Sequence, residues 1–129
     1  MTSYSLRSGI IAGTLAALAL GGIAQAHPRL LASKPTATGS SDGKGDITLK
    51  FSEALVAQFS GMSITMTDMP GMKMPAPMAM RIKTTVAADG KTLVGHPATP
   101  LPAGSYNVAW HAVTADTHRV AGSYGFQVK

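Results

Sequence analysis

Residues 47–51 read Ile47-Thr48-Leu49-Lys50-Phe51, so apolar and polar side chains alternate along them. Successive side chains of a β-strand point to opposite faces, and this alternation therefore predicts a strand with one buried face. Residues 63–67, Ser-Ile-Thr-Met-Thr, repeat the pattern. These two stretches indicate a fold built from β-strands.

Five further stretches fit short strands, at residues 29–32, 80–86, 92–94, 105–110 and 123–128. Segments rich in Gly, Pro, Ser and Asp separate them, as turns require. A short helical turn fits only within residues 51–59, and no stretch has the pattern of a long amphipathic helix. About seven short strands predict an all-β fold, a small Greek-key β-barrel or immunoglobulin-like sandwich.

The N-terminal segment has the pattern of an export signal. Arg7 precedes an apolar run over residues 10–24, and Ala24-Gln25-Ala26 is a small-residue cleavage motif. The run is about 15 residues long, whereas a membrane-spanning helix needs roughly 20. We therefore predict a cleaved signal peptide over residues 1–26 and one mature domain over residues 27–129, with no membrane insertion after cleavage.

Composition excludes several classes of function. The chain has 129 residues and no cysteine, which excludes disulfides, iron–sulfur clusters, Cys-containing zinc sites, cysteine nucleophiles and Cys-ligated blue copper. The formal charge is +5, but the basic residues are scattered and aromatic residues make up only 5% of the chain. This pattern does not favour nucleic-acid binding.

Two short segments carry nitrogen and carboxylate donors that suit a metal ion. Cleavage after Ala26 would give His27 a free α-amine, and the amine and imidazole of one residue can chelate an ion through two nitrogens. In Asp116-Thr117-His118, an extended backbone would place the Asp and His side chains on the same side. Such donors suit Cu(II), with zinc as the main competitor. The alternative is an ordinary turn with a surface histidine.

Methionines are concentrated in one segment. Seven of the eight lie between residues 62 and 80, where Pro70, Gly71, Pro75 and Pro77 favour a surface loop. Uncharged thioethers select Cu(I) over harder divalent ions. The alternatives are core packing, for which Met62 and Met80 are the best candidates, and an apolar surface for a partner.

Four motifs follow one another along the predicted mature chain. They are His27-Pro-Arg-Leu30, residues 51–61 (Phe-Ser-Glu-Ala-Leu-Val-Ala-Gln-Phe-Ser-Gly), Met69-Pro-Gly-Met72, and residues 110–118 (Trp-His-Ala-Val-Thr-Ala-Asp-Thr-His). Together they resemble the CopC/PcoC family of periplasmic copper-resistance proteins. The resemblance implies a small Greek-key β-barrel with a Cu(II) site and a methionine-rich Cu(I) site at opposite ends.

The resemblance also implies ligands, position by position. For Cu(II) these are the amine and imidazole of His27 and the imidazole of His118, with Asp116 and Glu53 as nearby carboxylates. From the sequence alone, Glu53 is merely an acid at a strand end. For Cu(I), the implied ligands are Met66, Met69, Met72 and Met78. Met74 occupies the position where some family members have a loop histidine. Met74 and Met80 are alternative Cu(I) ligands.

We therefore expect a monomeric periplasmic carrier, not an enzyme, that holds one Cu(II) and one Cu(I). The resemblance suggests a membrane copper importer and a periplasmic multicopper oxidase as partners. A histidine-brace copper monooxygenase is the first alternative, because such enzymes also pair an N-terminal histidine with a second one. An immunoglobulin-like structural module is the second. We expect His96 and His111 to be surface histidines and Trp110 to lie in the core.

Overall fold

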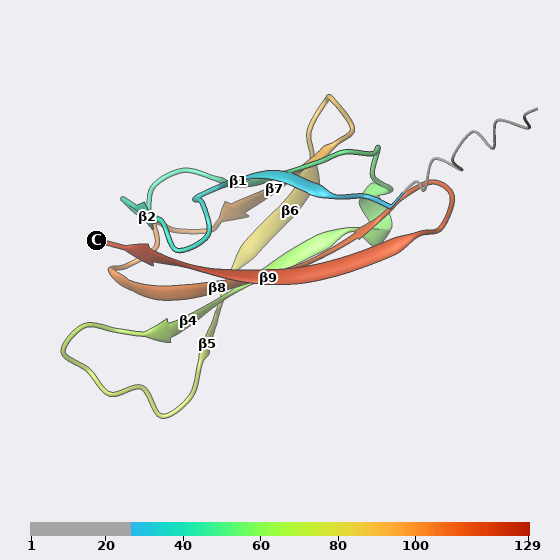
Figure 1. Cartoon of the computed structure of the whole chain (residues 1–129). Coiled ribbons are helices and arrows are strands. Elements are labelled where there is room, and N and C mark those ends of the chain that lie inside the picture. Colours follow the sequence, from blue (N-terminus) through green and yellow to red (C-terminus); the bar gives the residue numbers. More distant parts are fainter. Residues whose placement is uncertain (1–26) are drawn as a thin grey trace, which may run out of the picture.

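The computed structural model describes residues 27–129, and the predicted signal peptide over residues 1–26 lies outside the described residues. Within residues 27–129 the chain forms nine strands and one 3-10 helix (Figure 1). None of the described helices is long and apolar enough to cross a membrane. The elements are β1 (Leu30–Lys34), β2 (Ser40–Ser41), β3 (Ile47–Phe51), η1 (Ala57–Phe59), β4 (Gly61–Asp68), β5 (Met78–Met80), β6 (Ile82–Val86), β7 (Thr92–Pro97), β8 (Gly104–Val113) and β9 (Arg119–Val128).

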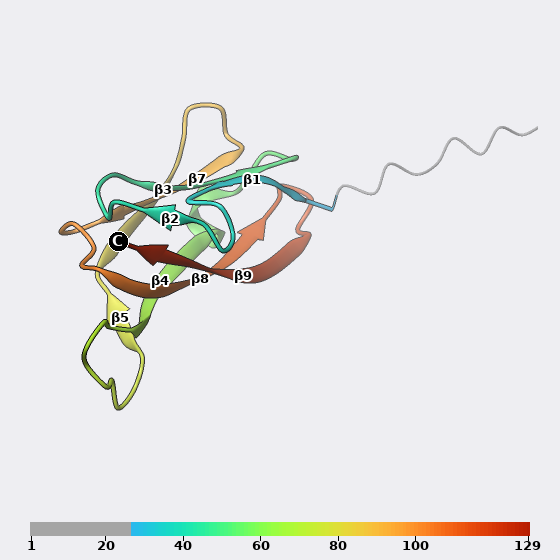
Figure 2. The same cartoon turned by 60° about the vertical axis from the view of Figure 1, so that its left-hand side comes forward.

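The strands form two sheets that pack face to face (Figures 1 and 2). One sheet has the order β1-β3-β7-β6, and the other has the order β2-β9-β8-β4-β5. All neighbouring strands are antiparallel except β2 and β9, which are parallel. The expected all-β sandwich is therefore confirmed.

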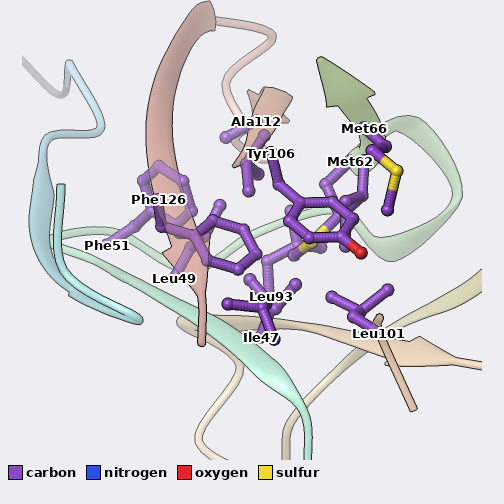
Figure 3. Packing of buried hydrophobic residues seen from close by; sticks show 13 residues of the cluster. Ile47, Leu49, Phe51, Met62, Met66, Leu93, Leu101, Tyr106, Ala112 and Phe126 are labelled. Carbon is purple, nitrogen blue, oxygen red and sulfur yellow. The ribbon is translucent and has the colours of Figure 1, made fainter. Parts of the chain in front are cut away.

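The core lies between the sheets and follows from the alternation along each strand. Ile47, Leu49 and Phe51 of β3 are buried. From the facing sheet, Met62 and Met66 of β4 enter the same core around the Tyr106 ring (Figure 3). The other buried apolar residues are Ile64, Leu93, Leu101, Val108, Ala112, Phe126 and Val128.

Some element boundaries differ from the sequence predictions. The stretch at residues 80–86 is divided into β5 and β6 at Arg81, because the chain passes there from one sheet to the other. β2 lies where only a turn was expected. The helical turn predicted within residues 51–59 is confirmed as η1.

Trp110 and the two remaining histidines lie close to where they were expected. Trp110 is half-buried and meets Phe51 edge-on, with ring centroids 5.1 Å apart. His111, next to it in β8, is half-buried with its ring beside Gly61. The side chain of His96 is 41% exposed, and its Nδ1 lies 2.9 Å from Oδ1 of Asp46. Within residues 27–129, no hydrogen bond or ion pair joins either histidine to the residues predicted to bind metal.

Candidate metal sites at the two ends of the sandwich

The first described residues are anchored at one end of the sandwich. The backbone N–H of Arg29 donates to Oγ of Ser52 (2.9 Å), and the N–H of Ser52 donates to the Arg29 carbonyl (2.9 Å). A few residues later, Leu55 forms a β-bridge with Thr114. The segment that contains Glu53 is thus held between the start of β1 and the end of β8.

The β8–β9 connection closes the same end. The N–H of Thr114 donates to the carbonyl of His118 (3.0 Å), and the N–H of Thr117 donates to the carbonyl of Thr114 (2.9 Å). Thr117 has a φ of +70°, in the left-handed region. The expectation of an extended backbone at residues 116–118 was therefore wrong, because these residues form a tight turn. The turn nevertheless brings the Asp116 and His118 side chains together.

The Asp116 carboxylate is held on both oxygens. The Thr114 hydroxyl donates to Oδ1, and Nδ1 of His118 lies 2.8 Å from Oδ2. These hydrogen bonds, the one from Thr114 first, lower the pKa of Asp116 to about 2. An ionised carboxylate can only accept hydrogen bonds, so this contact requires a proton on Nδ1 of His118, and in the neutral imidazole the lone pair on Nε2 is left for a ligand.

His27 stands next to this pair. Its ring centroid lies 5.0 Å from that of His118, with the two rings tilted by 59°. The side chains of Asp116 and His118 are about half exposed, so the group opens to solvent. The structure therefore brings together three residues that the sequence indicated, which are His27, Asp116 and His118.

Glu53 is half-buried, and no hydrogen bond or ion pair found within residues 27–129 joins it to this group. In the same part of the chain, no three His, Cys, Asp or Glu side chains are close enough to hold a metal ion by themselves. An ion at this end would need a further donor. The α-amine that cleavage before His27 would create is such a donor.

Thr114 is a residue of this end that the sequence analysis missed. Its side chain is buried, and its hydroxyl fixes the carboxylate that in turn orients His118. The motif at residues 110–118 contains Thr114, but a threonine two positions before an aspartate does not by itself indicate this contact.

Residues 69–77, which contain Met69, Met72 and Met74, form the loop between β4 and β5. This methionine loop lies at the opposite end of the sandwich (Figures 1 and 2). It begins with a turn in which the N–H of Met72 donates to the carbonyl of Met69 (3.1 Å). Gly71 has a φ of +73°. Pro at the second position and Gly with positive φ at the third are the residues that a type II turn favours.

Exposure of the methionines follows their position in this loop. Met72 is 64% exposed and Met78 is 52% exposed. Met69, Met74 and Met80 are half-buried and pack against the edge of the core. Of the predicted Cu(I) ligands, Met69, Met72, Met74 and Met78 therefore lie in the loop or at its end.

Met66 differs from those four residues in its burial. It is 1% exposed and shares the inner face of β4 with Ile64. Its Cα pairs in register with that of Met78, so the loop closes directly beside it. The alternation at residues 63–67 already placed Met66 on the same face as Ile64, and that was the signal for its burial.

Comparisons with known proteins identify relatives of this chain. A family model described as the CopC domain matches residues 30–129. Copper resistance protein C of Pseudomonas syringae pv. tomato is 43% identical over 123 residues, covering 95% of this chain and 97% of that protein. Copper resistance protein C of Escherichia coli is 46% identical over 106 residues, covering 82% and 84%.

A solved structure has the same fold. The crystal structure of PcoC, a methionine-rich copper resistance protein from Escherichia coli, superposes with a TM-score of 0.70 at 43% sequence identity. The match covers 81% of this chain and 100% of that chain.

Proposed function

The chain belongs to the CopC family, and from this membership we propose that it is a periplasmic copper-binding protein that carries copper for resistance and homeostasis. Its cargo is one Cu(II) at the end that holds His27 and one Cu(I) at the methionine loop. The carrier catalyses no reaction. The proposal is supported by relatives that are named copper resistance proteins.

One observation carries the Cu(II) half of the proposal. His27 and His118 lie with ring centroids 5.0 Å apart, beside a carboxylate that stays ionised at neutral pH. Once the signal peptide is removed, the α-amine and imidazole of His27 chelate Cu(II), and His118 adds Nε2. Asp116 either orients His118 or binds the ion as a further ligand. Glu53, at the same end of the sandwich, is the second carboxylate.

The Cu(I) half rests on the four loop methionines. Met69, Met72, Met74 and Met78 come from one turn-rich segment, and thioethers are the donors that Cu(I) prefers. Met66 would join them only by turning its side chain out of the core. We therefore assign the ion to the four residues that need no such change.

Exposed ligands suit a carrier. Because both groups of side chains open to solvent, a partner can replace the copper ligands one at a time, so the ion need not be released into water. A membrane copper importer and a multicopper oxidase of the periplasm are the partners we propose for this monomer.

The decisive experiment compares two forms of the protein, one beginning at His27 and one with a single extra residue before it. Cu(II) is titrated with EPR detection, and Cu(I) affinity is measured by anaerobic competition. The extension should weaken Cu(II) binding strongly, because it removes the free amine from His27, and it should leave Cu(I) binding unchanged. Equal Cu(II) affinity in the two forms would overturn the assignment to His27.

A further inference from the structure

The seven methionines of residues 62–80 are unequally protected from solvent. Met62 and Met66 are 8% and 1% exposed, inside the core (Figure 3). Met72 and Met78, in contrast, are more than half exposed. Residues 62–80 therefore contain both buried and largely exposed methionine side chains.

The two exposed methionines lie in the loop and on an edge strand. Met72 ends the turn at residues 69–72, in the loop that extends from the sandwich (Figure 2). Met78 begins β5, which is the edge strand of its sheet within the described part of the chain. A small oxidant in solution can therefore reach both side chains without opening the fold.

Peroxides attack such sulfur atoms by oxygen transfer. The thioether sulfur donates an electron pair to one peroxide oxygen, an S–O bond forms and the O–O bond breaks. The sulfur is oxidised by two electrons to the sulfoxide, and hydrogen peroxide is reduced to water. The product is a polar sulfoxide whose sulfur has used one of its two lone pairs for the S–O bond and is no longer the soft thioether donor that Cu(I) prefers.

We propose that Met72 and Met78 are sites of reversible oxidation by peroxide, and that their conversion to the sulfoxide switches off Cu(I) binding while the folded domain persists. The copper part of this inference rests on the proposed function of the loop. Methionine sulfoxide reductases would restore the site: with two electrons and two protons from a thiol reductant, they return the sulfoxide to the thioether and release the oxygen as water.

The burial of Met62 and Met66 explains why the fold survives. Sulfoxides inside the core would place polar oxygen atoms among apolar side chains and destabilise the domain. Because these two side chains lie in the core, oxidation should spread to them only after unfolding. Damage is thus confined to the loop, where the modified side chains already face water.

The test oxidises the metal-free protein beginning at His27 with hydrogen peroxide in the presence of a chelator, and maps the added oxygen by peptide mass spectrometry over time. Met72 and Met78 should be modified first, Met69, Met74 and Met80 later, and Met62 and Met66 last. The double variant Met72→Leu/Met78→Leu should take up no oxygen during the first phase. A Met80→Leu variant should behave like the unaltered protein in that phase.

Copper binding is then measured on the protein stopped after the first phase. Its Cu(I) affinity should be lower by on the order of tenfold or more, because losing a ligand costs at least as much as losing an outer partner of one. Near-UV circular dichroism should not change, and treatment with methionine sulfoxide reductases should restore the affinity.

Each contrary outcome has a separate meaning. Oxidation of Met62 or Met66 as early as Met72 would overturn the assignment of the sites, and unchanged Cu(I) affinity after the first phase would overturn the switch. A protein that binds no Cu(I) before oxidation would overturn the proposed function and the switch together. The order of oxidation is measured without copper, so it would still decide the assignment.

Discussion

Thr114 is not a metal-ligand candidate, yet the geometry around His118 depends on it. Its buried hydroxyl donates to one oxygen of Asp116, and the other oxygen faces Nδ1 of His118. A chain of two hydrogen bonds thus fixes the tautomer of the imidazole and the direction in which Nε2 points. Outer partners of this kind commonly change metal affinity by about 10–100-fold.

Thr114→Val keeps the shape of the side chain and removes its hydroxyl. We expect Cu(II) affinity to fall by roughly tenfold, because Asp116 loses the partner that aligns it with His118. Cu(I) affinity, determined by the loop at the other end, should stay the same. Competition titrations measure both, and Thr84→Val on β6 of the other sheet makes the same chemical change as a control. Full Cu(II) affinity in Thr114→Val would contradict this role.

Gly122 leaves space for the Trp110 ring. A Cβ at position 122 would lie 2.6 Å from Cζ2 and 2.9 Å from Cε2 of Trp110, closer than two non-bonded carbon atoms can approach. The rigid ring cannot give way without disturbing Phe51, which it meets edge-on. A glycine at this place in β9 is therefore required by packing.

Gly122→Ala should lower the free energy of unfolding by about 1–3 kcal/mol, the usual cost of overpacking a core. Urea unfolding followed by Trp110 fluorescence measures this loss. Gly125→Ala in the same strand is the matched control, because a Cβ there would meet only the Tyr106 carbonyl oxygen at 3.5 Å, an ordinary contact. If the two variants are equally stable, Trp110 is not packed as described.

Among the elements, the turn at residues 69–72 decides how the methionine loop leaves β4. Gly71 provides the positive φ that the turn needs, and no atom lies within 4 Å of the place where its Cβ would be. The cost of a substitution there is therefore conformational strain without a clash. Gly45, with a φ of +88° and the same open surroundings, lies in a loop without methionines.

Gly71→Ala and Gly45→Ala should each lower the free energy of unfolding by about 1–2 kcal/mol, the cost of a left-handed conformation for a residue with a Cβ. Only Gly71→Ala should also weaken Cu(I) binding, because it changes the position of Met69 relative to Met72. Denaturant titration and anaerobic Cu(I) competition separate the two effects. An equal loss of Cu(I) affinity in Gly45→Ala would show that stability alone, and not the turn, controls the loop.

Sequence alternation located strands because each strand carries its own pattern, but it gave only part of β8 and β9, which extend beyond residues 105–110 and 123–128. It located β3 residue for residue, and it placed Ile64 and Met66 on one face of β4. It could not predict β2, whose two residues form a strand only through their parallel pairing with the distant β9. Such pairing depends on the folded chain and not on a local pattern.

The residue types in the candidate sites could be predicted from the sequence, but the contacts between them could not. The residue types of His27, Asp116 and His118 indicated a metal site, and the fold brings these residues together. The contact from Thr114 depends on turn geometry that no spacing reveals. Clustering alone could not separate Met66 from Met72. Met66 is buried because it lies on the inner face of β4, and Met72 is exposed because it lies in the loop beyond that strand.

At the scale of the whole molecule, the two candidate sites occupy opposite ends of a sandwich that is held together by one core (Figure 1). No side chain discussed for one site contributes to the other. Substitutions or ligands that share no partners usually have additive effects on stability, within about 0.3–0.5 kcal/mol.

Filling both ends should therefore stabilise the fold by the sum of the two separate effects. Each ion that binds only the folded state raises the unfolding temperature according to its own affinity and concentration. Thermal unfolding with Cu(II) alone, with Ag(I) as a redox-stable substitute for Cu(I), and with both ions measures the three shifts. A combined effect that departs from the sum by more than about 0.5 kcal/mol would show that the ends are coupled.

The two sides of the methionine loop are held unequally. On its outgoing side, β4 pairs with both β8 and β5 and so lies inside its sheet. On its returning side, β5 is a three-residue edge strand among the described strands, after which the chain crosses at Arg81 to β6 in the other sheet; the Arg81 carbonyl is bound by the N–H of Ala98 (3.0 Å). A force that pulls on the loop should therefore separate β5 from β4 and extend the chain as far as Arg81, while β4 stays in its sheet.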